Sequence, residues 1–210
     1  MDLLFNAFIT LLVVIDPVGV SATYSAMTAD YSPAERKKIA RGGLSIAAGI
    51  LYFFAFTGNA FLAALGISIP AFRIAGGILL FFLAIEMILV RQSGIRTATE
   101  SEKAEADARR DISVFPLAIP LIAGPGAITS VVLLMGHAWG DLWIEAGVLC
   151  VIGVALAITY GMLRLSERVT RLLGVTGRQV VGRVLGILLA ALAVQFVLDG
   201  IRGAGLLPHR

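Results

Sequence analysis

The sequence predicts an all-α membrane protein, with six transmembrane helices arranged as two inverted three-helix repeats and with helices one and four broken at the midplane. Three observations predict this fold: the composition, the recurrence of long apolar runs, and a similarity between the two halves of the chain. The 210 residues are 58% hydrophobic and 15% charged, with a mean hydropathy of +0.91. Globular proteins carry roughly 25% charged residues, so this chain leaves little room for a separate soluble domain.

Six apolar runs are long enough to cross a membrane, which takes about 20 residues of helix. These runs are residues 4–28, 42–65, 70–90, 113–136, 142–163 and 180–201. The first run opens with "MDLLFNAFIT" and has no basic segment before it, so we expect it to stay as a membrane span and not to be removed as a signal peptide. Cys150 is the only cysteine, which predicts neither an intrachain disulfide nor a cysteine metal cluster.

Basic residues predict how the helices are oriented. They gather in the connections after the first, third and fifth runs, namely Arg36, Lys37, Lys38 and Arg41, then Arg91, Arg96, Lys103, Arg109 and Arg110, then Arg164, Arg168, Arg171 and Arg178. The opposite side has only Arg73, Arg202 and Arg210. Because cytoplasmic connections carry the excess of Lys and Arg, we expect both termini outside. The pI of about 9.4 does not predict nucleic-acid binding, since no basic surface with aromatic side chains is present to read bases.

A polar segment divides the chain into two similar halves. This segment, residues 91–112, should be a solvated cytoplasmic linker between a first repeat (1–90) and a second repeat (113–210). "GILLFFLAIEMI" (77–88) pairs with "GILLAALAVQFV" (186–197), and "IDPVGVS" (15–21) pairs with "AGPGAIT" (123–129) at almost the same offset. Three spans per half is an odd number, so the second half must enter the membrane upside down. Inverted repeats of this kind are typical of secondary transporters, whose substrate site lies near the midplane.

Each half carries a helix breaker near the middle of its first apolar run. Asp16 and Pro17 lie near the centre of the first run, and Pro125 lies near the centre of the fourth. Proline interrupts the interior of a helix, yet it suits the first helical position, and aspartate is a good cap before it. We therefore predict half-helices that begin at Pro17 and at Pro125.

The two breaks predict a binding site for a small zwitterionic substrate. Free N–H groups at a half-helix start favour an anion, so we expect the Pro125 half-helix, with the Thr129 hydroxyl, to receive a carboxylate. Asp16 would attract the substrate ammonium or a coupling cation, H⁺ or Na⁺; no other cofactor is expected. The predicted binding residues are Asp16, Pro17, Gly19, Ser21, Gly124, Pro125, Gly126 and Thr129. The alternative is that Asp16 only caps its half-helix and contacts no ligand.

The two proline motifs resemble those of a known family. "IDPVG" (15–19) and "FPLAIPLIAGPGAI" (115–128), in a six-span chain of this length, resemble the MarC family of prokaryotic inner-membrane proteins, which is related to SnatA-type transporters of small neutral amino acids. The resemblance covers essentially the whole chain. It implies a multi-pass protein of the bacterial inner membrane and, for the characterised type, transport of glycine or alanine.

Two functions of different kinds follow from these observations. The first is a secondary transporter of small neutral amino acids, and the second is a non-transporting membrane protein with a stress or regulatory role. An enzyme is not expected, because the sequence has no paired midplane carboxylates, no Ser–His arrangement and no His or Cys ligand cluster. The two predicted breaks favour transport.

Overall fold

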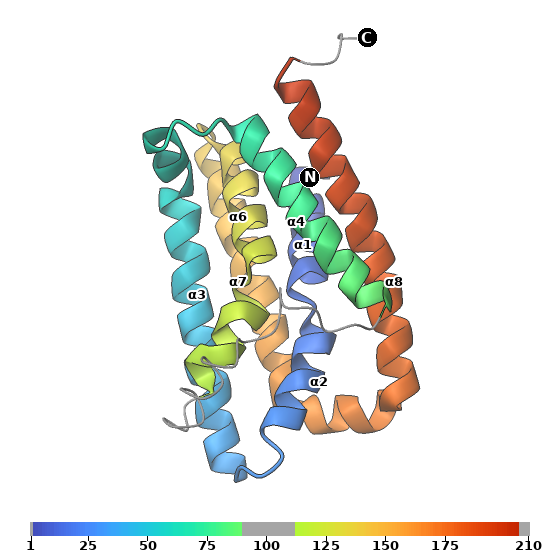
Figure 1. The fold of residues 1–210 in the computed structure, drawn as a ribbon. Helices are drawn as coiled ribbons and strands as arrows, with labels where there is room; N and C mark the ends of the chain where they lie inside the picture. The colour runs from blue at the N-terminus through green and yellow to red at the C-terminus, as the bar shows by residue number, and fades with distance from the viewer. Residues whose placement is uncertain (1, 90–111, 206–210) are drawn as a thin grey trace.

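The computed structural model describes residues 2–89 and 112–205, and every regular element within these ranges is a helix (Figure 1). Five helices in these ranges are long and apolar enough to cross a membrane: Leu3–Met27, Pro33–Ala64, Ile69–Leu89, Leu142–Arg164 and Thr176–Gly203. The bent pair Ser113–Ile122 and Pro125–Ala138 makes a sixth if it is counted as one span. The prediction of an all-helical, multi-pass membrane protein is confirmed. The predicted linker, apart from Ile112, lies outside the described residues.

The elements follow one another with short connections. The first half contains α1 (Asp2–Ile15), α2 (Pro17–Met27), α3 (Pro33–Ala64) and α4 (Ile69–Leu89). The second half contains η1 (Ser113–Ile122), α6 (Pro125–Ala138), α7 (Leu142–Arg164) and α8 (Ser166–Gly203).

Helix α3 is longer than the sequence predicted. The expected span began at residue 42, but the helix begins at Pro33 after a capping box, in which the Ser32 hydroxyl accepts from the Glu35 N–H and the Glu35 carboxylate accepts from the Ser32 N–H. Arg36 and Arg41, with the two lysines between them, therefore lie in the first turns of α3 and not in a loop. The predicted start was wrong because the apolar run begins only after these charged residues, whereas the helix already includes them.

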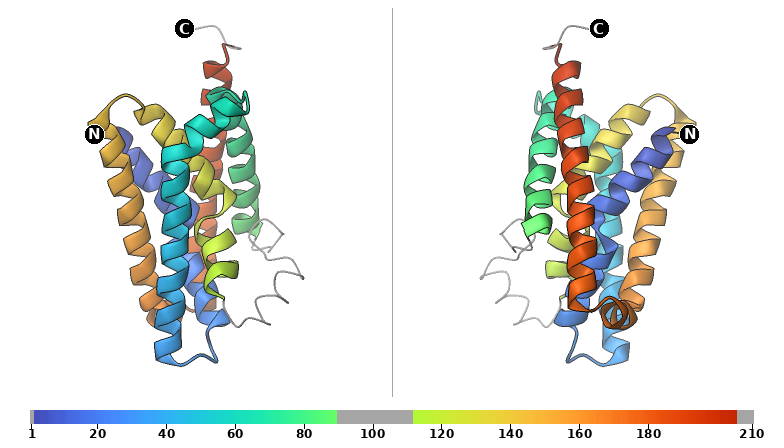
Figure 2. Two further views of the ribbon diagram at one scale, coloured as in Figure 1. Left: turned by 90° about the vertical axis from the view of Figure 1, so that its left-hand side faces the viewer. Right: turned by 90° about the vertical axis from the view of Figure 1, so that its right-hand side faces the viewer.

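Helix α8 contains a sharp bend at Gly174, where φ is 60° and ψ is −169°. This backbone conformation is accessible essentially only to glycine. The segment 166–173 consequently lies across one end of the bundle, and the rest of α8 runs along it (Figures 1 and 2). The apolar part starts at Thr176, four residues before the predicted start at residue 180.

Close helix packing builds the bundle. Helices α4 and α8 form its most extensive pair, and a Cβ on Gly77 of α4 would lie 2.7 Å from the carbonyl oxygen of Ala193 of α8. Such small residues let membrane helices approach closely. The core contains fully buried side chains from different helices, including Leu11, Leu80 and Ile152.

The start of α1 and the end of α8 lie at the same end of the bundle (Figures 1 and 2); we call it the N/C end. The connection between α2 and α3 and the beginning of α8 lie at the opposite end. We call that end the basic end, because the first turns of α3 and α8 carry Arg36, Arg41, Arg168 and Arg171. This arrangement agrees with an even number of membrane crossings.

Candidate functional site

The first span is interrupted at a single residue. Helix α1 ends at Ile15, α2 begins at Pro17, and Asp16 between them has φ 53° and ψ 67°. Within residues 2–89 and 112–205, Asp16 is the only non-glycine residue with positive φ, a conformation that Asp and Asn adopt more readily than other residues. The Asp16 N–H donates to the carbonyl of Leu12 (3.0 Å), and its carbonyl accepts from the N–H of Val20 (2.9 Å). Two backbone hydrogen bonds of Asp16 therefore continue across the interruption.

The Asp16 side chain caps α2. Its Oδ1 accepts a hydrogen bond from the N–H of Gly19 at 3.0 Å, and the residue is buried. A Cβ on Gly19 would lie 2.1 Å from Oδ2 of Asp16. The sequence analysis predicted Gly19 as a binding residue, and the structure adds a local reason for this glycine. The buried Ser21 hydroxyl, also a predicted site residue, donates to the carbonyl of Val18 at 2.8 Å.

The fourth span is interrupted more strongly. Element η1 is a π-helix with extended residues at Phe115 and Ile119, and each of these directly precedes a proline, which disfavours helical backbone at that position. The axis then turns by 55° between η1 and α6. A Cβ on Gly124, at this turn, would lie 2.4 Å from the carbonyl oxygen of Pro120. Only glycine fits there without a backbone shift.

The start of α6 differs chemically from the start of α2. Gly124 occupies the cap position and provides no side-chain hydrogen bond. The first backbone hydrogen bond of α6 runs from the N–H of Ile128 to the carbonyl of the cap residue Gly124, at 3.0 Å. The N–H groups of Gly126 and Ala127 precede this bond, so they belong to the set that a helix start can offer to an anion.

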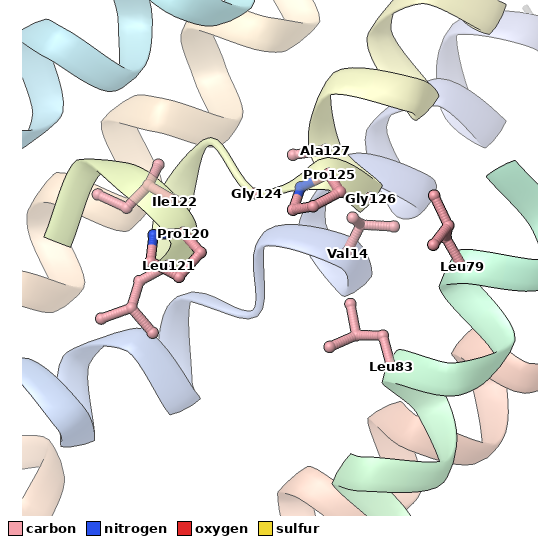
Figure 3. Close-up of a pocket in the computed structure, with 10 residues that line it drawn as sticks. All are labelled: Val14, Leu79, Leu83, Pro120, Leu121, Ile122, Gly124, Pro125, Gly126 and Ala127. Carbon is pink, nitrogen blue, oxygen red and sulfur yellow. The ribbon is translucent and has the colours of Figure 1, made fainter. Parts of the chain in front are cut away.

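A small hollow borders this helix start (Figure 3). Its lining residues are Val14, Leu79, Leu83, Pro120, Leu121, Ile122, Gly124, Pro125, Gly126 and Ala127. Its volume is about 10 Å³, which is roughly the space of one water molecule. The structure thus brings three predicted site residues to the hollow, together with side chains from α1 and α4 that the sequence did not indicate.

The other predicted residues, Asp16, Pro17, Gly19, Ser21 and Thr129, are not among those that line the hollow. Four of them form the start of α2, whose capping aspartate follows the lining residue Val14 by two positions.

Thr129 is directed towards α4. The residue is buried, and a Cβ on Gly76 would lie 2.0 Å from its methyl group, Cγ2. The methyl group of Thr129 therefore fills the space that the missing side chain of Gly76 leaves.

Polar contacts bridge the helices at both ends of the bundle. At the N/C end, Nη2 of Arg73 on α4 lies 2.6 Å from Nε2 of His137 on α6. At the basic end, Arg36 of α3 forms an ion pair with Glu167 of α8, and the Tyr24 hydroxyl of α2 donates to the Arg36 carbonyl at 2.6 Å. The sequence analysis counted Arg73 on the side of the membrane opposite the basic connections but gave no signal that it would meet His137.

Metal binding finds no support in the described part of the chain, where no group of three or more His, Cys, Asp or Glu side chains could hold an ion. The lining of the hollow contains no charged side chain, so backbone dipoles are the main polar feature at this point.

Comparison with known proteins identifies relatives over almost the whole chain. Residues 1–205 match the family described as "MarC family integral membrane protein". A "UPF0056 membrane protein" of Archaeoglobus fulgidus is 39% identical over 202 residues, which cover 94% of this chain and 91% of the relative. The "UPF0056 membrane protein YhcE" of Escherichia coli is 38% identical over 204 residues, covering 95% and 92% of the two chains.

A third relative, the "UPF0056 membrane protein YvbG" of Bacillus subtilis, is 34% identical over 199 residues, covering 94% and 93% of the two chains. No solved structure matches this chain. The resemblance carried by the two proline motifs is confirmed: the chain belongs to the MarC family of integral membrane proteins.

Proposed function

We propose that this protein is a secondary transporter of small neutral amino acids, such as glycine and alanine, in the bacterial inner membrane. The observation that carries the proposal is the start of α6, where N–H groups without a side-chain cap border a hollow at a bend between two helices. Broken helices with free ends are a recurrent means by which transporters bind ionic groups inside a membrane. The substrate is a zwitterion, and its carboxylate binds at the start of α6. The proposal involves no catalytic step and no cofactor.

The packing of the helices supports inverted repeats, with residues 1–90 and 113–210 as the two units. If the repeats are related by a pseudo-two-fold axis, exchanging them must convert each helix contact into another contact of the bundle. The contact of α3 with η1 and α6 has its counterpart in the contact of α7 with α1 and α2. The contact of α4 with α6 has its counterpart in that of α8 with α2, and the α4–α8 and α3–α7 pairs convert into themselves. The contact of α8 with α1 has no equally extensive counterpart between α4 and η1.

The two helix starts are chemically different, which suits a zwitterion. The start of α2 carries Asp16, and the start of α6 carries Gly124 at the corresponding place. Capping uses Oδ1 of Asp16, and a carboxylate offers roughly four acceptor positions, so capping does not prevent a cation contact. We therefore assign to Asp16 the attraction of the substrate ammonium or of a coupling H⁺ or Na⁺.

Transport requires the hollow to open towards each side of the membrane in turn. A volume of about 10 Å³ accommodates no amino acid, so the substrate enters only when helices separate. The Arg73–His137 contact would open at the N/C end, and the Arg36–Glu167 ion pair would open at the basic end. The basic end faces the cytoplasm, since cytoplasmic segments carry the excess of Lys and Arg, and both termini then lie outside.

Uptake into liposomes tests the proposal directly. The purified protein is reconstituted, and the uptake of labelled glycine, alanine and leucine is measured with no gradient, with a pH gradient and with a Na⁺ gradient. We expect uptake of glycine and alanine above that of protein-free liposomes, stimulation by one of the gradients, and little uptake of leucine. Folded protein that takes up none of these amino acids under any gradient would contradict the proposal and favour a non-transporting role.

A further inference from the structure

We infer that Ser130 is a substrate-binding residue, whose hydroxyl binds the carboxylate together with the N–H groups at the start of α6. This inference rests on the proposed function and names a residue that the sequence did not indicate. Ser130 is fully buried, and its Oγ has no hydrogen-bond partner in the described part of the chain. A buried polar group without a partner is uncommon and calls for an explanation.

Three other buried hydroxyls in this protein show which hydrogen bond Ser130 lacks. The Ser21 hydroxyl donates to the carbonyl of Val18 at 2.8 Å, and the Thr28 hydroxyl donates to the carbonyl of Tyr24 at 2.7 Å. The Thr159 hydroxyl donates to the carbonyl of Ala155 at 2.8 Å. Each of them uses a carbonyl of the preceding turn, as hydroxyls inside helices commonly do. The Ser130 hydroxyl makes no such bond, so it can take a different partner. Oδ1 of Asn59 and Oγ1 of Thr170 also have no partner in the described residues, but Asn59 lies beside Gly136 and Thr170 lies in the first part of α8, before Gly174.

The position of Ser130 relates it to the hollow. Residues four apart lie on the same face of a helix, and side chains lean towards the helix start, so Ser130 leans towards Gly126. Ser130 is not itself among the residues that line the hollow, but Gly126 lines it and adds no side chain between them. Leu80 of α4 and Val14 of α1 cover this place, at 2.7 Å and 3.2 Å from where a Cβ on Gly126 would be. Separation of α4 from α6 would uncover it.

A carboxylate has the right dimensions to join these groups. Four residues of α-helix rise about 6 Å, and the lean of the serine side chain shortens that distance. We therefore place the carboxylate beside Gly126, with one oxygen directed to the N–H groups of the first turn and the other to the Ser130 hydroxyl. Val14 and Leu80 pack closely around this place, so they favour a ligand whose remaining part is small.

Thr129 is not suited to the same task in this arrangement. Its methyl group packs against Gly76 of α4, and consecutive helix residues point about 100° apart. The hydroxyl that the sequence interpretation assigned to the carboxylate is thus replaced in this inference by the next residue in the chain.

The test compares Ser130→Ala with wild type and with a matched control, Thr159→Val, which removes a buried hydroxyl that does have a partner. The melting temperature of each purified protein is measured alone and with glycine, alanine or acetate at increasing concentration, and uptake is measured in liposomes. We expect S130A alone to be at least as stable as wild type, because it loses an unpaired polar group, and to bind glycine and acetate about tenfold or more weakly. T159V should show lower stability and unchanged affinity.

The outcomes separate this inference from the proposed function. If wild type takes up glycine and S130A binds it equally well, the inference is overturned and the function stands. If wild type takes up no amino acid but acetate stabilises it in a Ser130-dependent way, the function fails and the inference stands. If none of the three compounds stabilises wild type, the inference is overturned. Should S130A not fold, Ser130→Cys, which keeps the size but has a much weaker donor, must show the same loss of affinity.

Discussion

Gly19 and Asp16 form one structural unit: a Cβ on Gly19 would lie 2.1 Å from Oδ2 of Asp16, while the Gly19 N–H donates to Oδ1 of the same carboxylate at 3.0 Å. The aspartate can cap α2 only because the residue three positions later has no side chain. The motif "DPVG" therefore has a local physical meaning that is independent of any ligand.

Gly19→Ala should destabilise the protein by displacing this carboxylate from its capping position. Loss of an N-cap costs typically about 1 kcal/mol, and we expect at least that decrease in the free energy of unfolding, measured by denaturation in detergent. Gly49→Ala is the matched control, because nothing lies within 4 Å of a Cβ at that position in α3. G49A should be neutral or stabilising, since alanine favours a helix over glycine. A G19A variant as stable as G49A would show that the cap contributes nothing.

Asp16→Asn separates the charge of this side chain from its capping role. Asparagine caps a helix about as well as aspartate and also tolerates positive φ, so stability should change by less than about 0.5 kcal/mol. If Asp16 binds the ammonium or the coupling cation, the apparent affinity in liposome uptake should fall at least about tenfold, or about 1.4 kcal/mol. Unchanged affinity and ion dependence in a folded D16N protein would mean that Asp16 is a cap only.

Gly76 and Thr129 should be energetically coupled. A Cβ on Gly76 would lie 2.0 Å from Cγ2 of Thr129, so Gly76→Ala should cost about 1–3 kcal/mol of stability through overpacking. Thr129→Ser removes that methyl group and keeps the hydroxyl, and the double variant should recover most of the loss. A double-mutant cycle of unfolding free energies measures the coupling. Gly182→Ala, where nothing lies within 4 Å of the added Cβ, serves as the control; additive single effects would contradict the prediction.

The contact between Arg73 and His137 should make stability depend on pH. A guanidinium group only donates, so Nε2 of His137, 2.6 Å from Nη2 of Arg73, must be an unprotonated acceptor. Protonation of His137 would remove this acceptor and place two cations in contact.

The Arg73–His137 contact therefore stabilises the protein at pH 8, and this stabilisation is lost as the pH falls to 5. At a partly exposed site it contributes about 1 kcal/mol to the free energy of unfolding. His137→Gln, whose side-chain oxygen accepts at any pH, should reduce the pH dependence of the melting temperature relative to wild type. Titration of the other groups is common to both proteins and cancels in the comparison. Identical pH profiles would exclude His137 as the source.

The orientation in the membrane can be tested by labelling from each side. Tags at either terminus should react with an impermeant reagent added outside intact cells, and a single cysteine near residue 100, in a Cys150→Ala background, should react only after the cells are opened. The start of α1 and the end of α8 lie at the end of the bundle opposite the basic residues of α3 and α8, and basic segments face the cytoplasm. Labelling of the C-terminus from the cytoplasm alone would reverse the orientation.

The membrane spans were predictable because lipid permits few backbone arrangements, so an apolar run of sufficient length must form a helix. Their ends were less predictable. Hydropathy reports where the lipid ends, whereas the capping box at Ser32 decides where α3 begins. The bend at Gly174 depends on the backbone angles of one residue, which leave no trace in an apolar pattern.

The candidate site, too, was predictable from the sequence only in part. Pro17 and Pro125 are the first residues of α2 and α6, and local sterics, which the sequence shows, govern such positions. Leu79 and Leu83 reach the hollow only because α4 packs against α6, a tertiary contact that no local pattern encodes. The unpaired hydroxyl of Ser130 is visible only once every neighbouring acceptor has been placed, although its spacing of four from Gly126 was available in the sequence.

The small volume of the hollow has a kinetic consequence. With about 10 Å³ of space, the structure presents a conformation in which the proposed substrate cannot reach the proposed binding groups. Association then depends on the fraction of molecules that have opened, and the apparent affinity is weaker than the intrinsic affinity by that fraction. At high substrate concentration the rate of association reaches a ceiling set by the opening of the helices and not by diffusion. Substitutions far from the helix starts, in the contacts that close the two ends, would therefore alter apparent affinity without touching the substrate.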